Sequence, residues 1–124
     1  MTIAHEKAEL RKAVLKKLRD ESPLSRRRKS DAILDQLRRM SEVKKAQAFM
    51  FYVSASGEVD TLPFLLEMLR EGRTVTVPRV DLKTKLLISI EIHDPAKDLS
   101  PGAYGILEPK SEFKESFDPA RLDV

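Results

Sequence analysis

The first 45 residues of the chain mix apolar and charged positions at the spacing of an α-helix. Ser22 and Pro23 predict the start of a second helix. Serine is a favoured N-cap residue. Proline is favoured at the first helical position, because the N–H that it lacks would have no hydrogen-bond partner within the helix. That helix is expected to run to about Met40, and residues 42–45 to form a short helical turn. A first helix is predicted over residues 3–19, where apolar side chains recur every four residues: Leu10, Val14 and Leu18.

From residue 46 onwards the pattern changes to continuous apolar runs, which are typical of buried strands. An amphipathic segment lies between the first two runs. It predicts a helix that begins near Thr61 or Leu62 and ends at Gly72. A strand–helix–strand unit implies a parallel pair, so we expect an α/β fold with three α/β/α layers and a mainly parallel sheet. The tail over residues 117–124 resembles the approach to a further strand, so the sheet is expected to be truncated on its C-terminal side. Three strands are predicted: residues 47–53, 74–80 and 86–92.

A short loop of small and acidic residues separates the first predicted strand from the helix that follows it. Ligands of α/β proteins bind at the carboxyl ends of the strands, which makes Glu58 of this loop the first candidate site residue. The alternative is that Glu58 belongs to a solvated turn, while Asp60 or Thr61 caps the helix. Spacing alone leaves both interpretations open.

Composition limits the chemistry that the chain can perform. Its 124 residues, 41% hydrophobic and 35% charged, suit a single domain over residues 1–124. The absence of cysteine excludes disulfides, thiolate nucleophiles and cysteine-based zinc sites. No apolar stretch approaches the roughly 20 residues that span a bilayer, and the N-terminus lacks the pattern of a secretory signal. We therefore expect a cytoplasmic protein without a membrane partner.

The net charge of +3 is concentrated in the first 45 residues, notably in the basic run at residues 26–29. This run could attract nucleic acid, or it could be a solvated helix face. All the aromatic residues lie at Phe49 or later, which argues against base stacking by the run and against a nucleic-acid partner. His5 and His93 lack metal-ligand spacing, and no phosphate-loop pattern occurs, so no metal-binding residue is predicted.

Lys7 and Arg11 lie four residues apart on the first predicted helix and would share one face. Together they could grip a polyphosphate. The alternative is an ordinary charged helix face with Glu6 and Glu9 as partners.

Three separated motifs occur in a fixed order along the chain, at residues 7–11, 57–61 and 101–109, with the strand at 74–80 between the last two. Together they resemble the 5-formyltetrahydrofolate cyclo-ligase family, also called 5,10-methenyltetrahydrofolate synthetase. The resemblance covers nearly the whole chain but only about the first two thirds of a family member. The later glycine-rich, basic loop of the family has no counterpart in this sequence, so the chain is expected to be the N-terminal part of such a domain.

This resemblance implies ATP-dependent cyclisation of 5-formyltetrahydrofolate to 5,10-methenyltetrahydrofolate, with release of ADP and phosphate and with Mg²⁺ as cofactor. It implies substrate binding by Val53, Glu58 and Tyr104, and it assigns no catalytic residue in this chain. The implied ATP-binding residues are Lys7, Ala8, Glu9, Leu10 and Arg11.

A second hypothesis is a non-catalytic or truncated relative that keeps the fold and binds folate, a nucleotide or a partner chain. The missing glycine-rich loop favours this second hypothesis, whereas the retained residues of the motifs favour the enzyme. A truncated chain could also recover its site by self-association.

Overall fold

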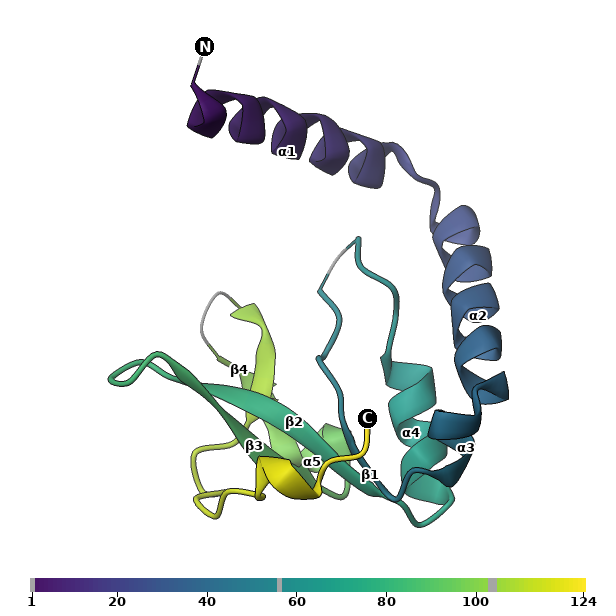
Figure 1. Cartoon of the computed structure of the whole chain (residues 1–124), viewed down its shortest axis with the longest axis vertical. Helices are drawn as coiled ribbons and strands as arrows, with labels where there is room; N and C mark the ends of the chain where they lie inside the picture. The colour runs from purple at the N-terminus through teal and green to yellow at the C-terminus, as the bar shows by residue number, and fades with distance from the viewer. Residues whose placement is uncertain (1, 56, 103–104) are drawn as a thin grey trace.

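A computed structural model describes residues 2–55, 57–102 and 105–124 of the chain (Figure 1). Its first three elements are helices: α1 (Ile3–Asp20), α2 (Pro23–Arg39) and α3 (Ser41–Lys45). The predicted cap of α2 is confirmed, because the Ser22 side chain accepts a hydrogen bond from Ser25 N at 3.1 Å and Pro23 is the first helical residue. All three helices begin and end within about two residues of their predicted bounds.

A three-stranded sheet follows, formed by β1 (Ala48–Met50), β2 (Thr74–Asp81) and β3 (Leu86–Ile92) in the order β1-β2-β3. Helix α4 (Leu62–Arg70) connects β1 to β2, which pair in parallel with Ala48 opposite Thr74, as the strand–helix–strand pattern predicted. Strands β2 and β3 form an antiparallel hairpin, since only a short polar turn joins them. The mixed α/β class is therefore confirmed.

Strand β1 is shorter than the predicted run over residues 47–53. Phe51 N still donates to Thr76 O at 2.9 Å. Two residues further along β2, Pro78 has no N–H with which to continue the ladder to β1. Tyr52 O accepts a hydrogen bond from the Thr61 hydroxyl at 2.6 Å. The chain thus leaves the sheet where the Glu58 loop begins.

The C-terminal third adds α5 (Pro95–Asp98), a small antiparallel pair of β4 (Leu99–Pro101) and β5 (Leu107–Pro109), and a 3₁₀ turn at Pro119–Arg121. Beyond that turn the chain reaches the edge of β1 that does not face β2. Asp123 N donates to Ala48 O at 2.9 Å, and Met50 N donates to Val124 O at 2.8 Å. The last residues therefore begin to pair with β1, in keeping with the expected approach to a further strand.

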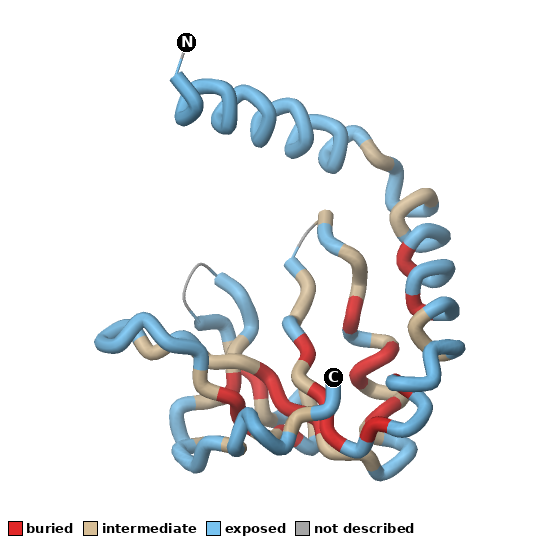
Figure 2. The backbone as a smooth tube through the Cα atoms, viewed as in Figure 1, coloured by how far each residue is buried: buried red, intermediate tan, exposed pale blue. Residues whose placement is uncertain are grey.

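The core lies between the sheet and the helices α2, α3 and α4 (Figure 2). At its centre are three phenylalanine rings: Phe49 stacks on Phe51 with centroids 5.8 Å apart, and Phe64 meets Phe51 edge-on at 5.6 Å. Each fully buried side chain of this size contributes about 1.5–3 kcal/mol relative to an exposed one. The other buried members of the cluster are Leu34, Val43, Ala46, Leu65, Met68, Val75, Val77, Ile92 and Leu99.

Helix α1 forms as predicted, yet it buries no residue (Figure 2). Its apolar side chains remain open to solvent, with Leu10 68% and Leu15 50% exposed. Helix α2 is intermediate, because Leu34 is buried and Ile33 is 42% exposed. Within the described residues, no helix combines the length and the apolar character needed to cross a membrane.

Candidate functional site

The loop between β1 and α4, called the Glu58 loop below and described over residues 51–55 and 57–61, carries the first candidate residue. Glu58 is exposed, and its Oε1 accepts a hydrogen bond from Ala55 N at 2.6 Å. Its own N–H donates to Ala55 O at 3.2 Å. Gly57 has a φ of 91° in this turn, a backbone conformation that residues with a Cβ rarely adopt. The carboxylate of Glu58 is therefore held over its own turn.

Asp60 anchors the loop through four contacts. Its Oδ1 accepts hydrogen bonds from Leu62 N at 3.2 Å and from the Ser54 hydroxyl at 3.3 Å. Its Oδ2 accepts from Arg27 Nη1 at 3.1 Å, and its backbone N–H donates to the Ser30 hydroxyl at 3.1 Å. These contacts tie the loop to α2 and to the start of α4.

The sequence left open whether Asp60 or Thr61 caps the helix after the loop, and the structure divides this role between the two residues. Thr61 is the residue before α4, but its side chain makes no cap hydrogen bond. The contact with the first turn comes from Asp60, which bonds Leu62 N. Thr61 instead donates to Tyr52 O and so fastens the end of β1 to the start of α4.

A cavity of about 240 Å³ opens beside the loop, and Val53 and Glu58 both line it. The structure thus brings together two of the three residues that the resemblance assigned to the substrate. The third, Tyr104, lies outside the described residues. The other lining residues are Tyr52, Val77, Pro78, Val80, Leu87, Ile106, Leu107 and Glu108.

Two polar residues of this cavity were missed in the sequence. Partial burial raises the pKa of Tyr52 above its ordinary value, and the nearby negative charge of Glu58 raises it further. Its hydroxyl donates to Val59 O at 3.3 Å. Glu108 of β5 accepts a hydrogen bond from Val80 N at 3.3 Å through Oε2. The sequence feature that could have identified Glu108 is its position as the acidic residue of the otherwise uncharged motif at 101–109.

Lys7 and Arg11 lie on α1, whose residues are all exposed, and they border a shallow surface depression of about 350 Å³. Leu10 lines the same depression, and Ala8 and Glu9 are exposed on the same helix. Within residues 2–55, 57–102 and 105–124, neither basic residue forms an ion pair, so the pairs with Glu6 or Glu9 that the alternative interpretation offered are not seen. Among the described residues, no side chain lines both this depression and the Glu58 cavity.

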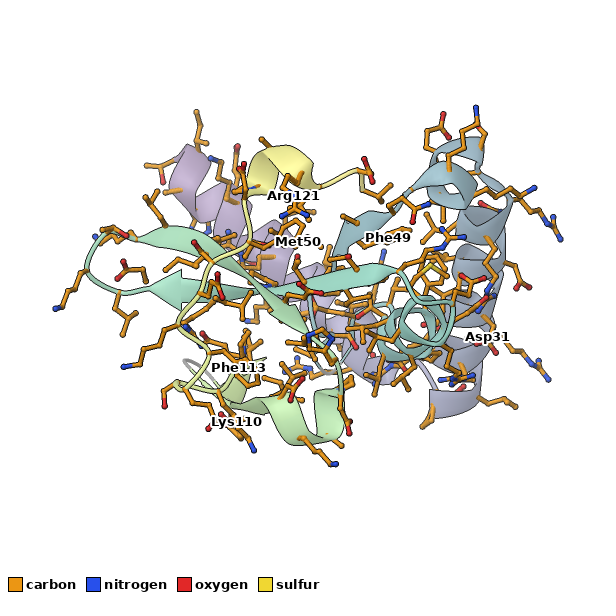
Figure 3. The ribbon with its side chains drawn as sticks, turned by 90° about the horizontal axis from the view of Figure 1, so that it is seen from below. Asp31, Phe49, Met50, Lys110, Phe113 and Arg121 are labelled. Atoms are coloured by element: carbon orange, nitrogen blue, oxygen red, sulfur yellow. The ribbon has the colours of Figure 1, made fainter. Side chains whose placement is uncertain are left out.

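A larger hollow of about 590 Å³ lies between β3 and the C-terminal tail. Phe113 and Arg121, which line it, are labelled in Figure 3. It contains charges of both signs, such as Glu91, Lys114 and Arg121. None of the residues predicted as site residues lines it, and the Arg121 guanidinium is engaged by the Phe117 ring at 4.5 Å. We therefore assign the candidate site to the smaller cavity at Glu58.

The fold and this cavity place the chain among α/β proteins with a pocket at the carboxyl end of a parallel strand. A sequence model of the 5-formyltetrahydrofolate cyclo-ligase family matches residues 3–124, and the chain belongs to this family. The resemblance drawn from the motifs is thus confirmed.

Among solved structures, this chain is similar to Aquifex aeolicus 5,10-methenyltetrahydrofolate synthetase, whose structure was determined by NMR. It matches with a TM-score of 0.78 and 34% sequence identity, over 94% of this chain and 57% of that chain. The present chain therefore spans little more than half the length of that protein. A search of curated proteins found no match.

Proposed function

We propose that the chain acts in the ATP-dependent cyclisation of 5-formyltetrahydrofolate to 5,10-methenyltetrahydrofolate, with release of ADP and phosphate. The observation that carries the proposal is the cavity in which Glu58 and Val53 meet on a largely apolar lining. Family membership and the 34% identity to a methenyltetrahydrofolate synthetase support the same reaction.

The cavity suits one end of a flat, polar heterocycle. Pockets for whole drug-sized ligands measure about 300–1,000 Å³, so a cavity of about 240 Å³ has room for a ring system but not for a complete folate. Val53 and Val77 offer apolar walls to the ring faces. The glutamate tail of a folate would then extend into solvent.

Glu58 supplies the polar recognition in this proposal. An ionised carboxylate only accepts hydrogen bonds, so it matches a ring edge that carries N–H donors, such as that of a pterin. One oxygen already accepts from Ala55 N, which fixes the direction of the group. The second oxygen can accept from the ligand without breaking that bond.

Lys7 and Arg11 are proposed to bind the phosphates of ATP, with Ala8, Glu9 and Leu10 completing the contact segment. Lysine provides a compact charge and arginine a planar fork of donors, and both suit phosphate oxygens. Bound ATP would supply the phosphoryl group that turns the formyl oxygen of the substrate into a leaving group.

Magnesium fits this chain only together with the nucleotide. Among the residues that the structure describes, no group of three or more His, Asp or Glu side chains is arranged to hold a metal ion. Mg²⁺ commonly binds through substrate phosphates and one or two carboxylates. We therefore propose that it arrives with ATP.

An alternative function is folate binding without turnover. Its support is the full exposure of α1, because the proposed phosphate contacts lie on a helix that buries no residue. In that case the chain would bind folate while a partner chain, or a second copy, would have to complete the nucleotide site.

One assay separates the two functions. The 124-residue chain is mixed with MgATP and 5-formyltetrahydrofolate, and the ultraviolet absorbance of the methenyl product is followed. Product formation supports the enzyme, and it should then require more ATP in the Lys7→Ala and Arg11→Ala variants. Folate binding without product supports the alternative, and absence of both overturns the proposed function for this chain.

A further inference from the structure

The side chains of Asp60 and Glu58 bond two neighbouring residues of the loop. Asp60 bonds the Ser54 hydroxyl, and Glu58 bonds the N–H of the next residue, Ala55. Both carboxylates therefore close the same turn from its C-terminal side. A displacement of Asp60 would move the peptide that fixes the direction of Glu58.

Helix α2 provides the fixed support for this turn. Ser30 is 5% exposed, and its hydroxyl accepts the hydrogen bond from Asp60 N. Buried hydroxyls keep such partners, because leaving them unpaired is costly. Arg27, one helical turn earlier, donates to the Asp60 carboxylate. The side chains of Arg27 and Asp60 are 51% and 41% exposed, so their ion pair alone contributes little to stability.

We propose that Asp60 is a positioning residue for the folate site. Together with Arg27 and Ser30 it holds the Glu58 loop so that the Glu58 carboxylate faces the cavity. This role rests on the proposed folate-binding function, and Asp60 itself does not line the cavity. Its loss is thus expected to weaken ligand binding more than it weakens the fold.

The substitution Asp60→Asn separates positioning from bulk structure. It preserves the size of the side chain and one carbonyl oxygen for Leu62 N, but its amide group then faces the donors of Arg27. The change Arg27→Gln supplies a neutral side chain with an acceptor oxygen, so the double variant Arg27→Gln/Asp60→Asn should recover part of the loss.

Asp31→Asn is the matched control. Asp31 Oδ1 lies 3.4 Å from Arg27 Nε, so this substitution removes a carboxylate from the same arginine. Asp31 is exposed on α2 at the margin of the molecule (Figure 3). Among the described residues, its ion pair is with Arg27 and none joins it to the Glu58 loop. A general charge effect would appear equally in both variants.

Binding of 5-formyltetrahydrofolate to the full 124-residue chain is measured by isothermal titration. We expect Asp60→Asn to raise the Kd roughly five- to tenfold, in the range of coupling between contacting residues. Asp31→Asn should bind like the parent chain, and the double variant should lie between them. Equal binding by Asp60→Asn and Asp31→Asn would overturn the proposal.

Amide hydrogen exchange at Ala55 provides a reading that is independent of the ligand. Asp60→Asn should speed exchange of this amide, whereas Asp31→Asn should leave it unchanged. If the parent chain fails to bind the folate, the proposed function fails for this chain, and the exchange data still decide the positioning role. Unchanged exchange in Asp60→Asn would then overturn it.

Discussion

Helix α1 and the Glu58 loop both carry proposed ligand contacts, but the chain holds them very differently. Helix α1 presents Lys7 and Arg11 on a helix without a buried residue. The Glu58 loop is bonded to α2, to the end of β1 and to the start of α4. A short motif thus locates a candidate residue, whereas the surrounding packing decides whether its side chain has a fixed direction.

The largest expected contrast is in stability. Phe64 is 3% exposed and its ring lies 5.6 Å from Phe51, so Phe64→Ala should lower the free energy of unfolding by about 3–5 kcal/mol. Leu15→Ala on α1, at a side chain 50% exposed, should change it by less than about 0.5 kcal/mol. Urea unfolding followed by circular dichroism measures both. Similar losses in the two variants would mean that α1 is packed in solution.

A smaller effect is expected at the junction of β1 and α4. Thr61 is 9% exposed and donates to Tyr52 O at 2.6 Å, so Thr61→Val should cost about 1–3 kcal/mol by leaving that carbonyl without its partner. Thr61→Ser retains the hydroxyl and should lose much less. Thermal unfolding compares them, and equal stability of the valine and serine variants would show that this bond does not hold the loop.

Glu58→Ala should affect binding and spare the fold. We expect 5-formyltetrahydrofolate to bind about tenfold more weakly, which corresponds to about 1.4 kcal/mol, with little change in Tm because Glu58 is exposed. Glu42→Ala, at an exposed glutamate of α3, is the control and should bind normally. A large drop in Tm with unchanged binding would make Glu58 a structural residue.

The smallest expected effect concerns the link between α1 and α2. The hydrogen bond from Lys29, with help from Ser25, lowers the pKa of Glu21 below its usual range. The stability from this contact is therefore present above the ordinary glutamate pKa and is lost as pH falls through the lowered one. An NMR titration should show the pKa of Glu21 rising in Lys29→Gln, and an unchanged pKa would remove Lys29 as its cause.

The sequence predicted local structure well, because local signals are strong in this chain. Ser22 and Pro23 marked the start of α2, and Gly72, with φ 77°, marks the end of the α4 segment. Glu58 became a candidate site residue because its loop follows a strand, and the structure places it on the lining of a cavity. The spacing of apolar residues correctly predicted that α1 is a helix. The same spacing does not show whether another part of the chain packs against those apolar residues.

The support of the site could not be predicted, because it comes from segments distant in sequence. Arg27 and Ser30 contact Asp60 only when α2 packs beside the loop, and the spacing of residues in the sequence does not predict this contact. Glu108 joins the cavity only when β5 lies next to β2. Such contacts depend on tertiary packing, which local patterns do not encode.

The most direct test compares the two ligands on the same chain. Isothermal titration of the 124-residue chain with 5-formyltetrahydrofolate and, separately, with MgATP measures how well each half of the site is organised. We predict measurable folate binding that depends little on salt, and nucleotide binding at least about tenfold weaker that fades as salt screens the exposed charges of Lys7 and Arg11. Tight MgATP binding without folate binding would contradict the account.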